Sequence, residues 1–120
     1  MAHAINWFEI PAANFERAKK FYETVLGIEM KIPFPDMKYA MFSAGMGEVN
    51  GGLVEEQHYE PSEKGALIYL NGGEDLADPL SRVEAAGGKV IIPKRSIGPN
   101  GFMAAFIDTE GNRVAFHSMK

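Results

Sequence analysis

The sequence has no cysteine among its 120 residues, which excludes disulfide bonds, thiolate nucleophiles and zinc or iron–sulfur sites with sulfur ligands. It also lacks any apolar run near the roughly 18 residues that a membrane-spanning helix needs. Its N-terminus has neither the basic start nor the unbroken apolar stretch of a signal peptide. We therefore expect a cytoplasmic protein that does not contact a membrane.

Basic residues are also scarce, with 12 Lys and Arg against 16 Asp and Glu, for a net charge of −4. A nucleic-acid-binding protein needs a basic face to displace the counterions of the phosphates. The basic pairs Lys19-Lys20 and Lys94-Arg95 are isolated from each other in the sequence. We expect no nucleic-acid partner.

An apolar fraction of 46% and a charged fraction of 23% are typical of a globular chain, and the length suits one domain. Two copies of one plan follow each other along the chain: a strand, a helix that ends at glycine, and three further strands. The expected helices are 15–25, capped by Asn14 and ended by Gly27, and 75–86, ended by Gly87. The expected strands are 5–10, 28–33, 37–43 and 49–55 in the first copy, and 66–70, 89–95, 102–108 and 113–118 in the second.

The polar connector 56–65 is too short to separate two independent domains, so the two copies should pack on each other. The sequence therefore predicts an α+β fold and a single domain over 1–120, with repeats at about 5–55 and 66–118. Two βαβββ repeats should form a curved mixed sheet around one cleft, with the helices on the outer face.

Strand alternation assigns side chains to the two faces of the sheet. In the first strand, Phe8 and Ile10 suit the apolar stripe of the helix, which leaves Trp7 and Glu9 on the opposite, concave face. The residues expected on this concave face are Trp7, Glu9, Leu67, Tyr69, Met103, Ala115 and His117. A mostly apolar and aromatic lining with few polar groups is typical of a small-molecule pocket. Alternatively, the same residues pack against the partner sheet or a second subunit.

Two segments carry a resemblance to a known family. Residues 14–27 resemble the first-helix signature of the vicinal oxygen chelate superfamily, which includes glyoxalase I, bleomycin-resistance proteins and extradiol dioxygenases. Residues 105–114 resemble the closing turn of that superfamily. The resemblance implies the two-repeat fold. It also implies a homodimer, for which open strand edges and aromatic surface give a physical reason.

The usual chemistry of the superfamily depends on a divalent metal held by His, Gln or Glu in the first and last strands of each repeat. In this sequence those positions fall on Trp7, Gly52, Leu67 and Ala115, none of which supplies an oxygen or imidazole ligand. The resemblance therefore predicts no metal and no other cofactor at these positions. Glu9 and His117 lie one alternation further along their strands. If those strands are neighbours, the pair forms either a displaced metal site or a hydrogen-bonded acid–imidazole contact.

Two functions remain open, and both require a small-molecule ligand. In the first, the protein is a glyoxalase-like lyase or isomerase in which Glu9 is the general base and His117 or Tyr69 donates a proton or hydrogen bond. The alternative for Glu9 is a solvated carboxylate at the cleft mouth, or one paired with Lys or Arg.

In the second function, the protein sequesters a planar or aromatic compound without catalysis, as bleomycin-resistance proteins do, and Trp7 and Tyr69 stack on it. Leu67, Met103 and Ala115 line the pocket in either case. His58 and Tyr59 in the connector either close over the ligand or belong to a solvated loop.

Overall fold

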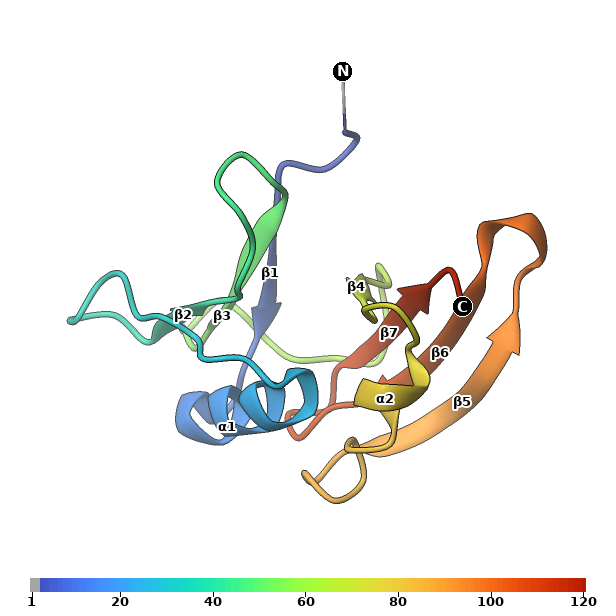
Figure 1. The fold of residues 1–120 in the computed structure, drawn as a ribbon. Coiled ribbons are helices and arrows are strands. Elements are labelled where there is room, and N and C mark those ends of the chain that lie inside the picture. The colour runs from blue at the N-terminus through green and yellow to red at the C-terminus, as the bar shows by residue number, and fades with distance from the viewer. Residues whose placement is uncertain (1–2) are drawn as a thin grey trace.

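The computed structural model describes residues 3–120 and contains seven strands, two α-helices and one 3₁₀ helix in this part of the chain (Figure 1). The elements of the first repeat are β1 (Trp7–Pro11), α1 (Phe15–Leu26), β2 (Tyr39–Met41) and β3 (Asn50–Val54). Those of the second repeat are β4 (Tyr69–Asn71), α2 (Ala77–Leu80), β5 (Lys89–Ser96), η1 (Gly98–Asn100), β6 (Phe102–Ile107) and β7 (Arg113–Ser118). None of the helices within residues 3–120 is long and apolar enough to cross a bilayer.

The strands form two sheets, one from each repeat, in the orders β1-β3-β2 and β4-β7-β6-β5. In the first sheet β1 pairs in parallel with β3, and β3 pairs antiparallel with β2. In the second sheet β4 likewise pairs in parallel with β7, and β7 pairs antiparallel with β6. This shared topology agrees with the duplicated plan of the sequence. The predicted α+β class is confirmed, and the mixed β-structure divides into two sheets. In Figure 1 the sheet of β1, β2 and β3 lies above α1, and the sheet of β4–β7 lies to the right of α1.

The second strand of the plan differs between the repeats. It is the eight-residue β5 in the second repeat, but in the first repeat the expected strand 28–33 is reduced to one bridge between Lys31 and Met41. Pro33 and Pro35 follow this bridge and have no backbone amide to donate to a ladder. The first sheet is therefore the smaller of the two.

Helix α1 begins and ends where the sequence predicts. The Asn14 side chain accepts a hydrogen bond from the Arg17 amide at 3.1 Å and caps the first turn. Gly27 has a φ of 67°, and its amide donates to the Glu23 carbonyl at 2.9 Å, which closes the last turn.

Helix α2 is much shorter than the expected 75–86. Beyond Leu80 the chain continues as hydrogen-bonded turns, in which the Arg82 amide donates to Pro79 and the Val83 amide to Leu80, three residues back. The Ser81 hydroxyl donates to the Asp78 carbonyl at 2.7 Å and so competes with the backbone for this acceptor. Regular helical bonding therefore stops after one turn, although Val83 stays buried.

One hydrophobic core joins the two repeats on the helix-bearing faces of both sheets. The Phe21 ring of α1 lies 5.9 Å from Phe106 of β6, which lies 4.9 Å from Phe116 of β7. Ile10 and Leu53 of the first sheet belong to the same cluster. The two copies thus pack on each other, as the short connector predicts.

A buried polar network also links the repeats. The closing turn 108–112 carries two buried carboxylates, Asp108 and Glu110. Tyr22 of α1 donates its hydroxyl to Asp108 at 2.7 Å. Glu110 accepts from the Asn14 amide at 2.6 Å and from Arg17 Nε at 2.8 Å. The closing turn 108–112 and helix α1, the two segments that carry the family resemblance, are therefore held together by buried hydrogen bonds.

Candidate functional site

The adjacent glycines of β3 let an aromatic ring lie against each face of the first sheet. A Cβ atom at Gly51 would lie 2.6 Å from the Phe8 ring on the core face. A Cβ atom at Gly52 would lie 2.6 Å from Tyr39 Cζ on the opposite face, called here the open face. Only glycine fits at either position.

The open face of the first sheet carries a group of four residues, Trp7, Glu9, Tyr39 and Tyr59, called here the open-face cluster. Trp7 Nε1 donates to the Tyr39 hydroxyl at 2.8 Å, and Glu9 lies opposite Gly52 in the strand register. Trp7 is 45% exposed and Tyr39 only 7%. As predicted from alternation, Trp7 and Glu9 point away from the core, while Phe8 and Ile10 contribute to it.

The connector reaches this cluster through Tyr59. The Glu9 carboxylate, as hydrogen-bond acceptor and as negative charge, raises the pKa of Tyr59. The pKa of Tyr39 is also raised, first by burial and further by Glu9, against the opposing effect of the Trp7 hydrogen bond. Both phenols therefore stay protonated at neutral pH.

The second sheet presents a different surface on its corresponding face. Met103 and Ala115 form a small buried group with Ala105, against which Leu67 and Ile92 pack. Within one chain, Met103 and Ala115 are therefore covered by neighbouring side chains. Their role as ligand contacts stays a prediction.

His117 lies on the same sheet and is half-buried. Its Nε2 atom lies 2.6 Å from the Asn100 carbonyl oxygen. Because a carbonyl oxygen only accepts, Nε2 carries the proton and donates it. This hydrogen bond holds the imidazole against the hairpin that contains η1.

Glu9 and His117 lie on different sheets. β1 pairs with β3, whereas β7 lies between β4 and β6, so the strands that carry the two residues are not neighbours. The acid–imidazole contact and the displaced metal site both required neighbouring strands, and a single chain does not provide them. The catalytic role of each residue stays a prediction.

The family's four metal positions carry side chains that do not fit a divalent cation. Trp7 donates its N–H to Tyr39, Gly52 is covered by the Tyr39 ring, and Leu67 and Ala115 are apolar. Within residues 3–120, no three His, Asp or Glu side chains lie close enough together to hold a metal ion. The absence of a metal cofactor stays a prediction.

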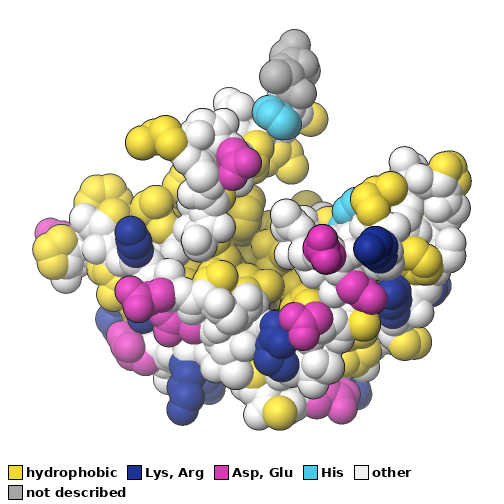
Figure 2. Space-filling view, in the orientation of Figure 1, with side chains coloured by type: hydrophobic (Ala, Val, Ile, Leu, Met, Phe, Trp, Pro, Cys, Tyr) yellow, Lys and Arg dark blue, Asp and Glu magenta, His cyan; other side chains and the backbone are white. Residues whose placement is uncertain are grey.

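A cleft of about 780 Å³ opens between the two repeats, and apolar side chains cover its floor (Figure 2). Its first wall comes from Phe8, from Leu26 at the end of α1, and from residues 42–44 and 48–50. Its second wall is the segment 66–71 around β4. The cleft lies along the free edges of β1 and β4, which are outer strands of their sheets.

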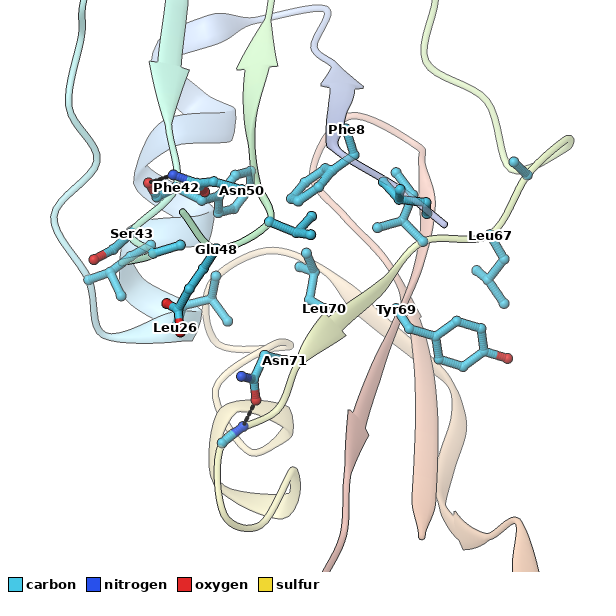
Figure 3. Close-up of a pocket in the computed structure, with 17 residues that line it drawn as sticks. Phe8, Leu26, Phe42, Ser43, Glu48, Asn50, Leu67, Tyr69, Leu70 and Asn71 are labelled. Atoms are coloured by element: carbon cyan, nitrogen blue, oxygen red, sulfur yellow. Dashed lines mark hydrogen bonds between the residues drawn. The ribbon is translucent and has the colours of Figure 1, made fainter. Parts of the chain in front are cut away.

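Figure 3 shows the side chains that line this cleft. The Phe8 and Phe42 rings lie 5.4 Å apart, and Leu70 points toward them from β4. The Tyr69 ring points away from the two phenylalanines and is 51% exposed. Glu48 is the one charged residue of the lining within the described chain, and its carboxylate accepts from the Gly45 amide at 2.7 Å.

Of the residues predicted to bind a ligand, Leu67 and Tyr69 line the cleft, whereas Trp7, Met103 and Ala115 do not. Sequence reasoning placed Phe8 in the core and did not include it in the site. Alternation shows which side of a strand a residue occupies, but not which strand edges face each other. No sequence signal identified Phe42.

Tyr39 and Tyr59 of the open-face cluster were also missed as a pair. Gly52 was a usable signal for Tyr39, because a glycine inside a strand often marks the close approach of another group. Tyr59 lies in a connector whose path the strand pattern does not determine.

The fold and the cleft define a small α+β protein built from two repeats of related topology, and comparisons agree with this class. Residues 5–45 match the family model described as bleomycin resistance protein-like N-terminal. A "Glyoxylase-like domain-containing protein" from Didymella fabae is 35% identical over an alignment 118 positions long, and the alignment covers 92% of this chain and 90% of the relative. The chain therefore belongs to the glyoxalase and bleomycin-resistance family of the vicinal oxygen chelate superfamily.

Two solved structures share the fold at low sequence identity. A glyoxalase/bleomycin resistance protein from Albidiferax ferrireducens superposes with a TM-score of 0.76 at 15% identity, covering 95% of this chain and 97% of the other. TnmS3, an antibiotic binding protein from a Streptomyces species, gives a TM-score of 0.67 at 22% identity and covers 98% of both chains. At these identities the likeness concerns the fold alone.

Proposed function

We propose that this protein binds a small, largely apolar molecule in the cleft between its two repeats. The observation that carries the proposal is the cleft itself, whose volume of about 780 Å³ falls within the usual range for ligand pockets. Phe8 and Phe42 offer ring surfaces on one wall, and Leu67 and Leu70 offer aliphatic surface on the other. Glu48 adds a single carboxylate to the lining.

Non-catalytic sequestration agrees best with this geometry. Glu9 and His117, which the sequence predicted as catalytic groups, lie on separate sheets of one chain and outside the cleft lining. A protein described as antibiotic binding shares the fold, which supports a related role here.

The absence of cysteine supports a cytoplasmic location for this role.

One observation favours a lyase or isomerase as the second candidate. Glu9 lies beside Tyr59 and Tyr39, which the carboxylate and burial keep protonated. A carboxylate base next to neutral phenol donors suits proton abstraction beside a carbonyl group. Replacement of Glu9 with Gln separates the candidates, because an enzyme loses turnover while it keeps ligand affinity, whereas a binding protein has no turnover to lose.

The proposal includes a homodimer. Large apolar side chains are exposed on the first repeat, with Phe34 51% exposed and Ile32 and Met37 each 46% exposed. The outer edges of β1 and β4 also have unpaired backbone groups. Size-exclusion chromatography with light scattering tests this, and a monomer at micromolar concentration contradicts it.

The cleft can be tested by thermal-shift screening against metabolites and antibiotics, with and without divalent metals. The exposed Ala66 lines the cleft, so Ala66→Trp fills the space where a ligand would bind. Ala85 is also exposed but lies outside the lining, so Ala85→Trp is the matched control. We expect a hit to stabilise the wild type and Ala85→Trp but not Ala66→Trp. Equal stabilisation of both variants contradicts cleft binding.

A further inference from the structure

The open-face cluster brings three aromatic rings and one carboxylate to a single surface. Trp7 comes from β1 and Tyr39 from β2, the two strands that flank β3, and Gly52 of β3 leaves room for the Tyr39 ring to lie against the strand. The 2.8 Å hydrogen bond from Trp7 Nε1 to Tyr39 fixes the orientation of the indole. Trp7 and Tyr59 remain 45% and 38% exposed, so their rings are accessible to a ligand.

The Glu9 carboxylate forms no ion pair with a basic side chain in the described part of the chain. Within residues 3–120, the ion pairs of Lys and Arg use other carboxylates, and none of them involves Glu9. Glu56 adds further negative potential at Tyr59. The hydrogen bond to Glu9 raises the pKa of Tyr59, and the Glu9 charge raises it further, since loss of the phenol proton would place a second negative charge beside this carboxylate.

We propose that the open-face cluster binds the alkylated ammonium group of a small organic cation. The faces of Trp and Tyr attract cations, and N-methyl groups make apolar contacts with the same ring faces. Glu9 neutralises the charge of the ligand. A metal ion needs several oxygen or nitrogen ligands, whereas this cluster offers one carboxylate. The site goes beyond the cleft, because none of the four residues lines it.

The single tryptophan of the chain makes this site directly measurable, because intrinsic tryptophan fluorescence reports on Trp7 alone. The probe is choline, and its control is 3,3-dimethylbutan-1-ol, a neutral molecule of nearly the same shape. Both are titrated at an ionic strength held constant with sodium chloride. We expect a saturable change with choline and an apparent affinity for the alcohol that is weaker by about tenfold or more.

Variants assign the effect to the cluster. Glu9→Gln and Tyr59→Leu should each weaken choline binding by roughly three- to tenfold, whereas Tyr59→Phe keeps the ring and should bind like the wild type. Circular dichroism and thermal melts of each variant check that the fold is intact. No response to choline, an equal response to the alcohol, or unchanged affinity in both weakening variants would overturn the proposal. Because no residue of the open-face cluster lines the cleft, these results and those of the thermal-shift screen test the two proposed sites separately.

Discussion

Among single residues, Gly51 and Gly52 determine which side chains can lie against the two faces of β3. One glycine admits the Phe8 ring on the core face, and the other admits Tyr39 on the open face. The two neighbouring glycines thus allow an aromatic ring to pack on each face of β3. An added methyl group at Gly52 should act mainly on the open-face cluster.

We expect Gly52→Ala to lower the free energy of unfolding by about 1–3 kcal/mol, because the new Cβ would lie 2.6 Å from Tyr39 Cζ and force the ring to move. The same shift should break the hydrogen bond from Trp7 and change its emission. Urea denaturation followed by fluorescence measures both effects. In a Tyr39→Ala background the cost should largely disappear; a cost that stays constant shows that this contact is not the cause.

At the scale of elements, the sequence predicts well where local rules dominate. Asn14 and Gly27 fix the ends of α1, and alternation places Phe8 and Ile10 on the core side. Local rules fail where they compete. The Ser81 hydroxyl takes the Asp78 carbonyl and α2 ends early, and the prolines after Lys31 reduce the expected strand to a bridge. The cleft forms where the edges of the two sheets face each other. Local sequence rules do not predict it, because the placement of the sheets depends on tertiary packing.

The contact between α1 and the closing turn predicts a pH dependence. Burial by itself would raise the pKa of Glu110, but hydrogen bonds from Arg17, the Asn14 amide and Thr109 outweigh burial and lower it. The folded pKa therefore lies below the ordinary value of 4.5, and the stabilisation is present above that pH. It is lost as the pH falls through the folded pKa.

We expect Glu110→Gln to destabilise the protein at pH 7 and to weaken the loss of stability below about pH 4.5. Denaturation at a series of pH values measures this difference. Glu16→Gln, on the exposed first turn of α1, is the control. A pH profile of Glu110→Gln parallel to that of the wild type contradicts the assignment.

At the scale of the whole molecule, the side chains at the family's four metal positions lead us to expect a protein without bound metal. Protein purified without a chelating tag should contain much less than one equivalent of zinc, nickel or iron, because Trp7, Gly52, Leu67 and Ala115 provide no side-chain ligand. Inductively coupled plasma mass spectrometry measures this directly. A stoichiometric metal that survives dialysis against EDTA contradicts the prediction.

The two repeats differ in the extent of their β-ladders. The second repeat pairs β5, β6 and β7 over long antiparallel registers, whereas the first repeat has only the Lys31–Met41 bridge where β5 has its counterpart. Backbone amides near β2 should therefore exchange with deuterium through local openings at lower free energy than those of β6. We therefore expect the surface of the first repeat to change shape at a lower energetic cost than that of the second repeat.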